Sequence, residues 1–310
     1  MTKTRGLAHG SSFESARRLS ETRLAPLEDP GRWDRRRSAG MATENEDDRG
    51  YGRYALAAQV GPRFSSDWKS PEHRARRLVS EFIGTFGLTF VLSGGAAILA
   101  GQGGADLAPY QFAFILSTVS ALWLVAAVFC LGDISAHFNP AMTLAFTLRG
   151  DMTWLMALAY FAVQFLGASA GSLTAAGLFG YGGHLAATMP QPGQYWQAVV
   201  LETILTFGMV LVVLSMADGP KLVGSFVPAA VGAYVMAAGT MGGPYDGAAF
   251  NPARAFGPDL ARGDLSTYWI YPLGSLIGVL VAVATARFLR GPAKAQEAQA
   301  AMGAPLDKGA

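Results

Sequence analysis

The chain contains two copies of Phe-Asn-Pro-Ala, at residues 138–141 and 250–253, which lie 112 positions apart. Asparagine is among the best helix N-caps, and proline directly after the cap costs little because that backbone amide has no partner within the helix. Each copy therefore predicts the start of a helix. The residues concerned are Asn139, Pro140 and Ala141 in the first copy and Asn251, Pro252 and Ala253 in the second.

The pair of motifs indicates a particular kind of chemistry if both helix starts face one lumen. Aligned peptide dipoles place about half a positive charge at each helix N-terminus, so two of them make a barrier to cations and protons. The amides of Asn139 and Asn251, held by capping, would donate hydrogen bonds to the oxygen of a passing water or hydroxyl. Such a site favours neutral solutes that carry lone pairs.

The elements that position these motifs are apolar. Hydrophobic residues make up 51% of the 310 residues and charged residues only 15%, which argues against a soluble globule. About 20 apolar residues let a helix cross the hydrocarbon core, and six runs come near that length. These runs cover residues 79–100, 110–131, 154–179, 197–216, 225–241 and 268–289. We therefore expect an all-α membrane protein with six transmembrane helices.

The motif segments, 134–148 and 247–260, are too short to span and are expected to be re-entrant half-helices. The span that opens each half also repeats: Glu81 precedes Thr-Phe-Gly at 85–87, and Glu202 precedes Thr-Phe-Gly at 206–208. Three spans per half make the second half enter the membrane from the opposite side, as an inverted repeat. The two half-helix N-termini then meet near the bilayer midplane, buried in protein or lining a water-filled cavity.

Charge is concentrated at the N-terminus, where 16 of the 24 Lys and Arg residues lie between Lys3 and Arg77. Acidic residues are mixed among them, which favours a disordered cytoplasmic tail at 1–77 over nucleic-acid binding. A channel domain follows at 78–290, and a second cytoplasmic tail at 291–310. Basic residues flank the spans on the side of both termini, so we expect a multi-pass protein of the plasma or inner membrane with cytoplasmic termini.

The paired motifs and the Glu-led spans resemble the aquaporin, or major intrinsic protein, family over about residues 80–289. Residues 247–258, Gly-Ala-Ala-Phe-Asn-Pro-Ala-Arg-Ala-Phe-Gly-Pro, are similar to the family's second pore loop nearly throughout. The resemblance implies an aquaporin-like fold and a passive channel in the lipid bilayer, not an enzyme, without cofactor or metal. It also implies a homotetramer whose partners are water and small neutral solutes, with no nucleic acid.

The resemblance also implies roles for three charged residues. Arg254 would line the outer constriction, donate hydrogen bonds to permeants and repel cations; the alternative is an arginine that extends to the membrane interface. Glu81 and Glu202 would accept hydrogen bonds from the re-entrant loop of their own half, and a proton relay is the alternative. His137 is expected to brace its loop, because the four histidines are too scattered for metal or acid-base chemistry.

The same resemblance locates the selectivity filter. Counting back from the second motif places two filter positions on Gly239 and Ala248, and Gly239 stands where water-selective members usually carry histidine. The position in the second span falls on Val119 or Ser120, because the loop before the first motif is one residue shorter than usual. These small residues predict a filter wider than that of a strict water channel.

The main prediction for function has three alternatives. The main prediction is a passive channel for water and small uncharged, glycerol-like polyols that excludes protons and ions. Ala255 stands where glycerol-type members usually carry aspartate, which favours the alternative of metalloid hydroxides such as arsenous, boric or silicic acid. A secondary transporter needs ionisable coupling residues at the midplane beyond Glu81 and Glu202, and a membrane enzyme needs a nucleophile or metal cluster; the sequence offers neither set.

Overall fold

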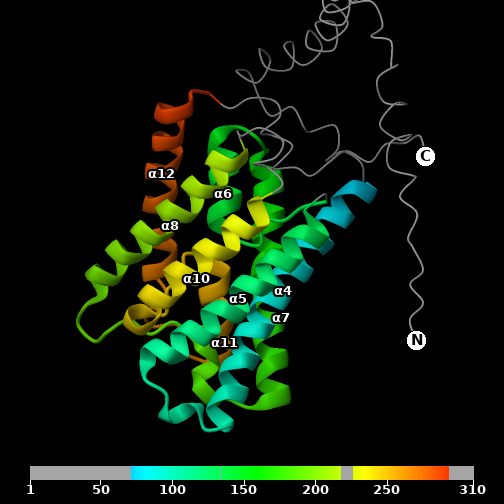
Figure 1. The fold of residues 1–310 in the computed structure, drawn as a ribbon. Helices are drawn as coiled ribbons and strands as arrows, with labels where there is room; N and C mark the ends of the chain where they lie inside the picture. Colours follow the sequence, from blue (N-terminus) through cyan, green and yellow to red (C-terminus); the bar gives the residue numbers. More distant parts are fainter. Residues whose placement is uncertain (1–70, 133, 218–225, 293–310) are drawn as a thin grey trace, which may run out of the picture. The chain divides into compact units, whose positions relative to one another are not determined.

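A computed structural model of the chain describes residues 71–132, 134–217 and 226–292, all of which belong to one compact unit. In this part the chain forms six long and two short α-helices (Figure 1). The long helices are α4 (Pro71–Gly101), α5 (Pro109–Leu131), α7 (Trp154–Phe179), α8 (Tyr195–Ala217), α10 (Val227–Asp246) and α12 (Ile270–Arg290). The short helices are α6 (Pro140–Arg149) and α11 (Pro252–Arg262), and single 3-10 turns, η1 (Gly104–Asp106) and η2 (Gly182–Ala186), lie in two loops.

Five of the described helices are long and apolar enough to cross a membrane: α4, α5, α7, α8 and α12. The sixth long helix, α10, has 20 residues but ends in a run rich in glycine that lowers its hydropathy. The predicted architecture of six long helices and two half-helices is confirmed. Residues 1–70 of the predicted N-terminal tail and residues 293–310 of the predicted C-terminal tail lie outside the described residues.

Two boundaries of the long helices differ from the sequence-based ones by five residues or more. Helix α4 begins at Pro71, inside the predicted tail, because the charged residues that follow the proline extend the helix beyond its apolar part. Helix α10 continues to Asp246, past the predicted end at 241. Pro244 lies in its last turn, and the helix stops only at Gly247, whose φ of 96° lies in the left-handed region that favours glycine.

The long helices pack in pairs: α4 with α7, α8 with α12, and α5 with α10. The first two pairs join the first and third spans of each half, and the third pair joins the halves. Glycines let these helices approach closely, as their spacing predicts. A Cβ on Gly171 of α7 would lie 2.3 Å from the Phe86 carbonyl oxygen of α4, and one on Gly278 of α12 would lie 2.6 Å from the Thr203 carbonyl oxygen of α8.

The two half-helices pack across the repeat. Helix α11 belongs to the second half but packs mainly on α7 of the first, and α6 of the first half contacts α12 of the second. Each half-helix is therefore held partly by the opposite half, and the two motifs are brought together inside the protein.

Candidate pore and filter

The two Phe-Asn-Pro-Ala motifs meet at their asparagines. Asn139 caps α6 by accepting a hydrogen bond from Ala141 N at 2.8 Å, and Asn251 caps α11 by accepting from Ala253 N at 3.1 Å. Each amide also donates across the repeat: Asn139 Nδ2 to the Phe250 carbonyl and Asn251 Nδ2 to the Phe138 carbonyl, both at 2.9 Å. We call these two contacts the crossed amide bonds.

The crossed amide bonds determine what the asparagines can offer a solute. An asparagine amide has two N–H donors, and one on each residue is committed to the opposite loop. The second N–H of each amide remains for a permeating molecule, so the pair presents two fixed donors beside two helix N-termini. This arrangement attracts neutral oxygen atoms and repels cations.

Glu81 of α4 lies fully buried behind the first motif. Its Oε1 accepts hydrogen bonds from His137 N at 2.8 Å and Ser135 Oγ at 2.6 Å, and its Oε2 from Phe138 N at 2.7 Å and Gln164 Nε2 at 2.8 Å. Both carboxylate oxygens are therefore satisfied by groups that fix the loop, which meets the cost of burying the charge.

Glu202 of α8 takes the same place behind the second motif. Its two oxygens accept from Ala249 N and Phe250 N, each at 2.6 Å. In both loops the residue before the asparagine has a left-handed backbone, with φ of 49° at Phe138 and 34° at Phe250. A non-glycine residue held there costs on the order of 1–3 kcal/mol, and the glutamates hold it through the backbone amides.

His137 is 7% exposed and packs inside its loop. Its Nδ1 lies 3.0 Å from Thr143 Oγ1, and its ring stacks on Phe146 with centroids 4.8 Å apart and meets Tyr160 edge-on at 5.3 Å. Within residues 71–132, 134–217 and 226–292, no group of three or more His, Cys, Asp or Glu side chains could hold a metal ion.

A cavity of about 750 Å³ reaches from the loop that contains η2 down to Asn251. We call it the vestibule. Its wall includes Leu88, Leu92, Phe112, Leu116, Ser117, Ser120, Gly239, Ala248, Asn251 and Arg254. The vestibule thus brings together Gly239, Ala248 and Arg254, the three filter positions that the sequence singled out in the second half.

On α5 the vestibule is lined by Ser120 and by Ser117, whereas Val119 is not among its lining residues. Ser117 lies against Gly239, since a Cβ built on that glycine would be 2.5 Å from Ser117 Oγ. The sequence reasoning missed Ser117. Helical spacing could have found it, because residues three apart share a face and residues one apart do not.

The charged residue of the vestibule, Arg254, is held apart from its counter-charges. Its Nη1 is buried, and none of the described residues accepts a hydrogen bond from it. Coulombic attraction reaches it from Asp259, Glu202 and Asp246, in decreasing order. The Oδ1 of Asp246 accepts from Ala248 N at 2.8 Å, which fixes a filter residue whose φ is 45°.

Two buried half-helices with joined N-termini, an arginine beside them and a vestibule above define a helical membrane channel. Residues 67–285 match the model of the major intrinsic protein family. The chain is 34% identical over 221 residues to aquaporin NIP2-1 of Oryza sativa subsp. japonica, covering 71% of this chain and 72% of that protein. It is also 34% identical over 207 residues to aquaporin NIP1-1 of Zea mays, covering 66% and 71%.

Among solved structures, the X-ray structure of the aquaglyceroporin from Plasmodium falciparum is similar at a TM-score of 0.58 and 23% identity, covering 68% of this chain and 94% of that one. This likeness shows the aquaporin fold. The chain belongs to the major intrinsic protein family, whose members are channels and not enzymes.

Proposed function

We propose that this channel conducts small neutral hydroxylated solutes in addition to water, and that it excludes protons and cations. The observation that carries the proposal is the composition of the vestibule wall around Arg254, where Gly239, Ala248, Ser117 and Ser120 are all small. A wall of small residues leaves width for a polyol, and the serine hydroxyls and the arginine supply hydrogen-bonding groups.

Two solute classes fit this wall: glycerol-like polyols and undissociated metalloid hydroxides such as arsenous, boric and silicic acid. Both are neutral and carry several hydroxyl groups. The apolar part of the wall, with Leu88, Leu92 and Phe112, supports the passage of carbon-bearing polyols. Ala255, buried on α11, provides no acceptor beside Arg254, which supports the metalloid hydroxides.

The test measures solute permeability and water permeability in the same proteoliposomes by stopped-flow light scattering. We expect glycerol and arsenous acid to enter protein-containing vesicles faster than empty ones, with no proton leak. If the protein accelerates water flux but not glycerol, urea or arsenous acid, the channel is a water channel and the proposal fails.

The proposal extends to location and assembly. The channel lies in the plasma or inner membrane with both termini cytoplasmic, on the support of the basic residues in the N-terminal tail. It assembles as a homotetramer, as the family resemblance implies. Accessibility of tags at the two termini in intact cells tests the orientation, and light scattering of the detergent-solubilised protein tests the assembly.

A further inference from the structure

The loop between α7 and α8 forms one wall of the vestibule, although it has little regular structure. His184, Ala186, Ala187, Met189, Pro190 and Gln191 all line the cavity. Three consecutive non-glycine residues, His184, Leu185 and Ala186, have φ between 50° and 57°. Such left-handed backbone persists only where the surroundings impose it. The position of this wall therefore depends on contacts to the rest of the protein.

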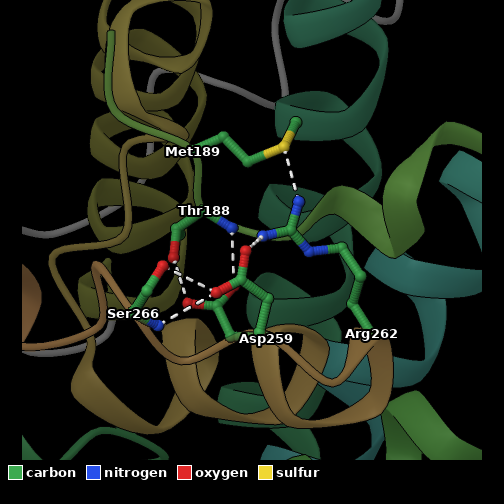
Figure 2. A network of polar contacts seen from close by, with 6 residues as sticks. Thr188, Met189, Asp259, Arg262 and Ser266 are labelled. Carbon is green, nitrogen blue, oxygen red and sulfur yellow. Dashed lines mark hydrogen bonds and ion pairs between the residues drawn. The ribbon is translucent and has the colours of Figure 1, made fainter. Parts of the chain in front are cut away.

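Two of those contacts, both buried, are made by Thr188, which is fully buried itself. Its backbone N–H donates to Asp259 Oδ1 at 2.8 Å and its hydroxyl donates to Asp259 Oδ2 at 2.7 Å (Figure 2). Both oxygens of the Asp259 carboxylate therefore accept a hydrogen bond from the same loop residue. Hydrogen bonds to an ionised carboxylate are stronger than those between neutral groups. We call this contact the Asp259 clamp.

The Asp259 clamp joins the loop to the two elements that carry the filter. Asp259 lies on α11, the helix that begins at Asn251 and carries Arg254. On its other side Thr188 touches the filter loop, because a Cβ on Gly247 would come within 3.0 Å of Thr188 Cα. Three residues further on, Gln191 N donates to the Tyr245 carbonyl at 3.1 Å.

A second set of polar contacts lies beside the clamp and is partly exposed to solvent. Arg262 donates to Asp264 at 2.8 Å, and Ser266 donates to the same carboxylate through its N and Oγ (Figure 2). The hydrogen bonds from Ser266 lower the pKa of Asp264, whose side chain is 49% exposed. Exposed contacts of this kind are screened by water, so this set provides a control for the buried clamp.

We propose that Asp259 and Thr188 determine the specificity of the channel by position: the clamp fixes the vestibule wall at residues 184–191, and that wall sets the largest solute admitted. The inference rests on the proposed function only in that the protein is a pore for neutral solutes. Neither residue touches the solute. They act through the loop at residues 184–191, and the filter side chains and the Asp259 clamp together define the width of the pore.

The test measures the size cut-off with the series water, glycerol, erythritol and ribitol in proteoliposomes of matched protein density. Thr188→Val keeps the shape of the side chain and removes the hydroxyl donor, and Asp259→Asn removes the charge and leaves one acceptor oxygen for the two donors of Thr188. We expect both variants to loosen the wall. Permeability to the smallest solute that the wild type excludes should then rise roughly tenfold relative to water permeability. This factor corresponds to the free energy of one hydrogen bond to a charged group. Thr188→Ser keeps the hydroxyl donor and should therefore keep the wild-type cut-off.

Ser266→Ala is the matched control, because it removes a hydrogen bond of the partly exposed set and leaves the clamp intact. An unchanged cut-off in inserted, water-conducting Thr188→Val and Asp259→Asn proteins overturns the proposal. A wild type that passes water alone contradicts the proposed solute class but not this inference. In that case glycerol is the first excluded solute, and the inference predicts that the variants admit it.

A measurement on the wild type covers the case in which the variants do not fold. Amide hydrogen exchange reports local opening, and the clamp predicts that the Thr188 amide is protected as strongly as the amides of α11. If the Thr188 amide exchanges as fast as that of Gly193 in the same loop, the clamp does not hold the wall and the inference is wrong.

Discussion

Arg254 lines the vestibule, and we expect its charge to act on permeants because no ion pair among the described residues neutralises it. Its buried Nη1 has no hydrogen-bond acceptor among the described residues, while Asp259, Glu202 and Asp246 act on it only from a distance. We therefore expect Arg254 and the paired helix N-termini to form two successive barriers to cations.

Replacing Arg254 tests its contribution to cation exclusion separately from that of the helix N-termini. We expect Arg254→Ala to keep water conduction and to raise proton or cation leak by about tenfold or more, because the loss of a fixed charge at the filter removes about 1.4 kcal/mol or more of electrostatic repulsion. Fluorescent pH measurements in proteoliposomes give the leak. Arg287→Ala, exposed at the end of α12 and outside the vestibule wall, is the control. A leak equal to that of the wild type would remove Arg254 from the filter.

The width of the filter can be tested at Gly239, but only together with its neighbour. A Cβ on Gly239 would lie 2.5 Å from Ser117 Oγ, so Gly239→His alone is expected to disturb the packing of α5 on α10. The double variant Ser117→Gly/Gly239→His makes room for the imidazole. We expect it to reduce glycerol and arsenous acid permeability roughly tenfold relative to water, through bulk and not charge.

The control for the double variant is Ser117→Gly, against which the effect of the imidazole is read separately from the loss of the serine hydroxyl. Glycerol and water permeability are measured in the same vesicle preparation. Glycerol passage through the double variant at the wild-type rate would show that Gly239 does not border the narrowest part of the pore.

Among the elements, the glycines of α7 decide how closely it approaches α4. A methyl group on Gly171 would lie 2.3 Å from the Phe86 carbonyl oxygen, which neither backbone can avoid without moving. Gly177 on the same helix has no heavy atom within 4 Å of such a methyl group. The two positions therefore differ in packing and not in helix propensity.

We expect Gly171→Ala to destabilise the protein by about 1–3 kcal/mol or more. Gly177→Ala should leave stability unchanged or raise it by about 0.5–1 kcal/mol, because alanine is the better helix former. Thermal unfolding in detergent, followed by circular dichroism, compares the two. Equal midpoints would show that the contact between α4 and α7 tolerates an added methyl group.

The elements also show which parts of the structure the sequence can predict. Hydropathy located the six long helices, and the repeated Asn-Pro-Ala located both half-helices, because those signals are local. The choice between Val119 and Ser120 stayed open because it depends on how α5 is rotated about its axis, and Ser117 follows by helical spacing only once Ser120 is chosen. The contact between Thr188 and Asp259 joins residues 71 positions apart through an irregular loop, and no periodic pattern announces it.

The whole molecule has the inverted repeat found in many secondary transporters, yet the glutamates that open its two halves are bound to the pore loops. The two carboxylates buried behind the motifs, Glu81 and Glu202, bind backbone amides with both oxygens. We therefore expect solute to follow its own gradient only. Imposing a proton or sodium gradient on proteoliposomes at equal internal and external solute concentrations should move no net solute, and net accumulation would contradict a passive channel.

The crossed amide bonds have a kinetic consequence. A carrier must separate its two repeats and bring them back for every molecule it moves, so its rate reaches a ceiling at high substrate concentration. Here Asn139 and Asn251 each bind the loop of the opposite half, and that rocking would break both bonds at the midplane. Flux should therefore rise in proportion to solute concentration without saturating. Its temperature dependence should resemble that of diffusion in water, not that of a conformational change.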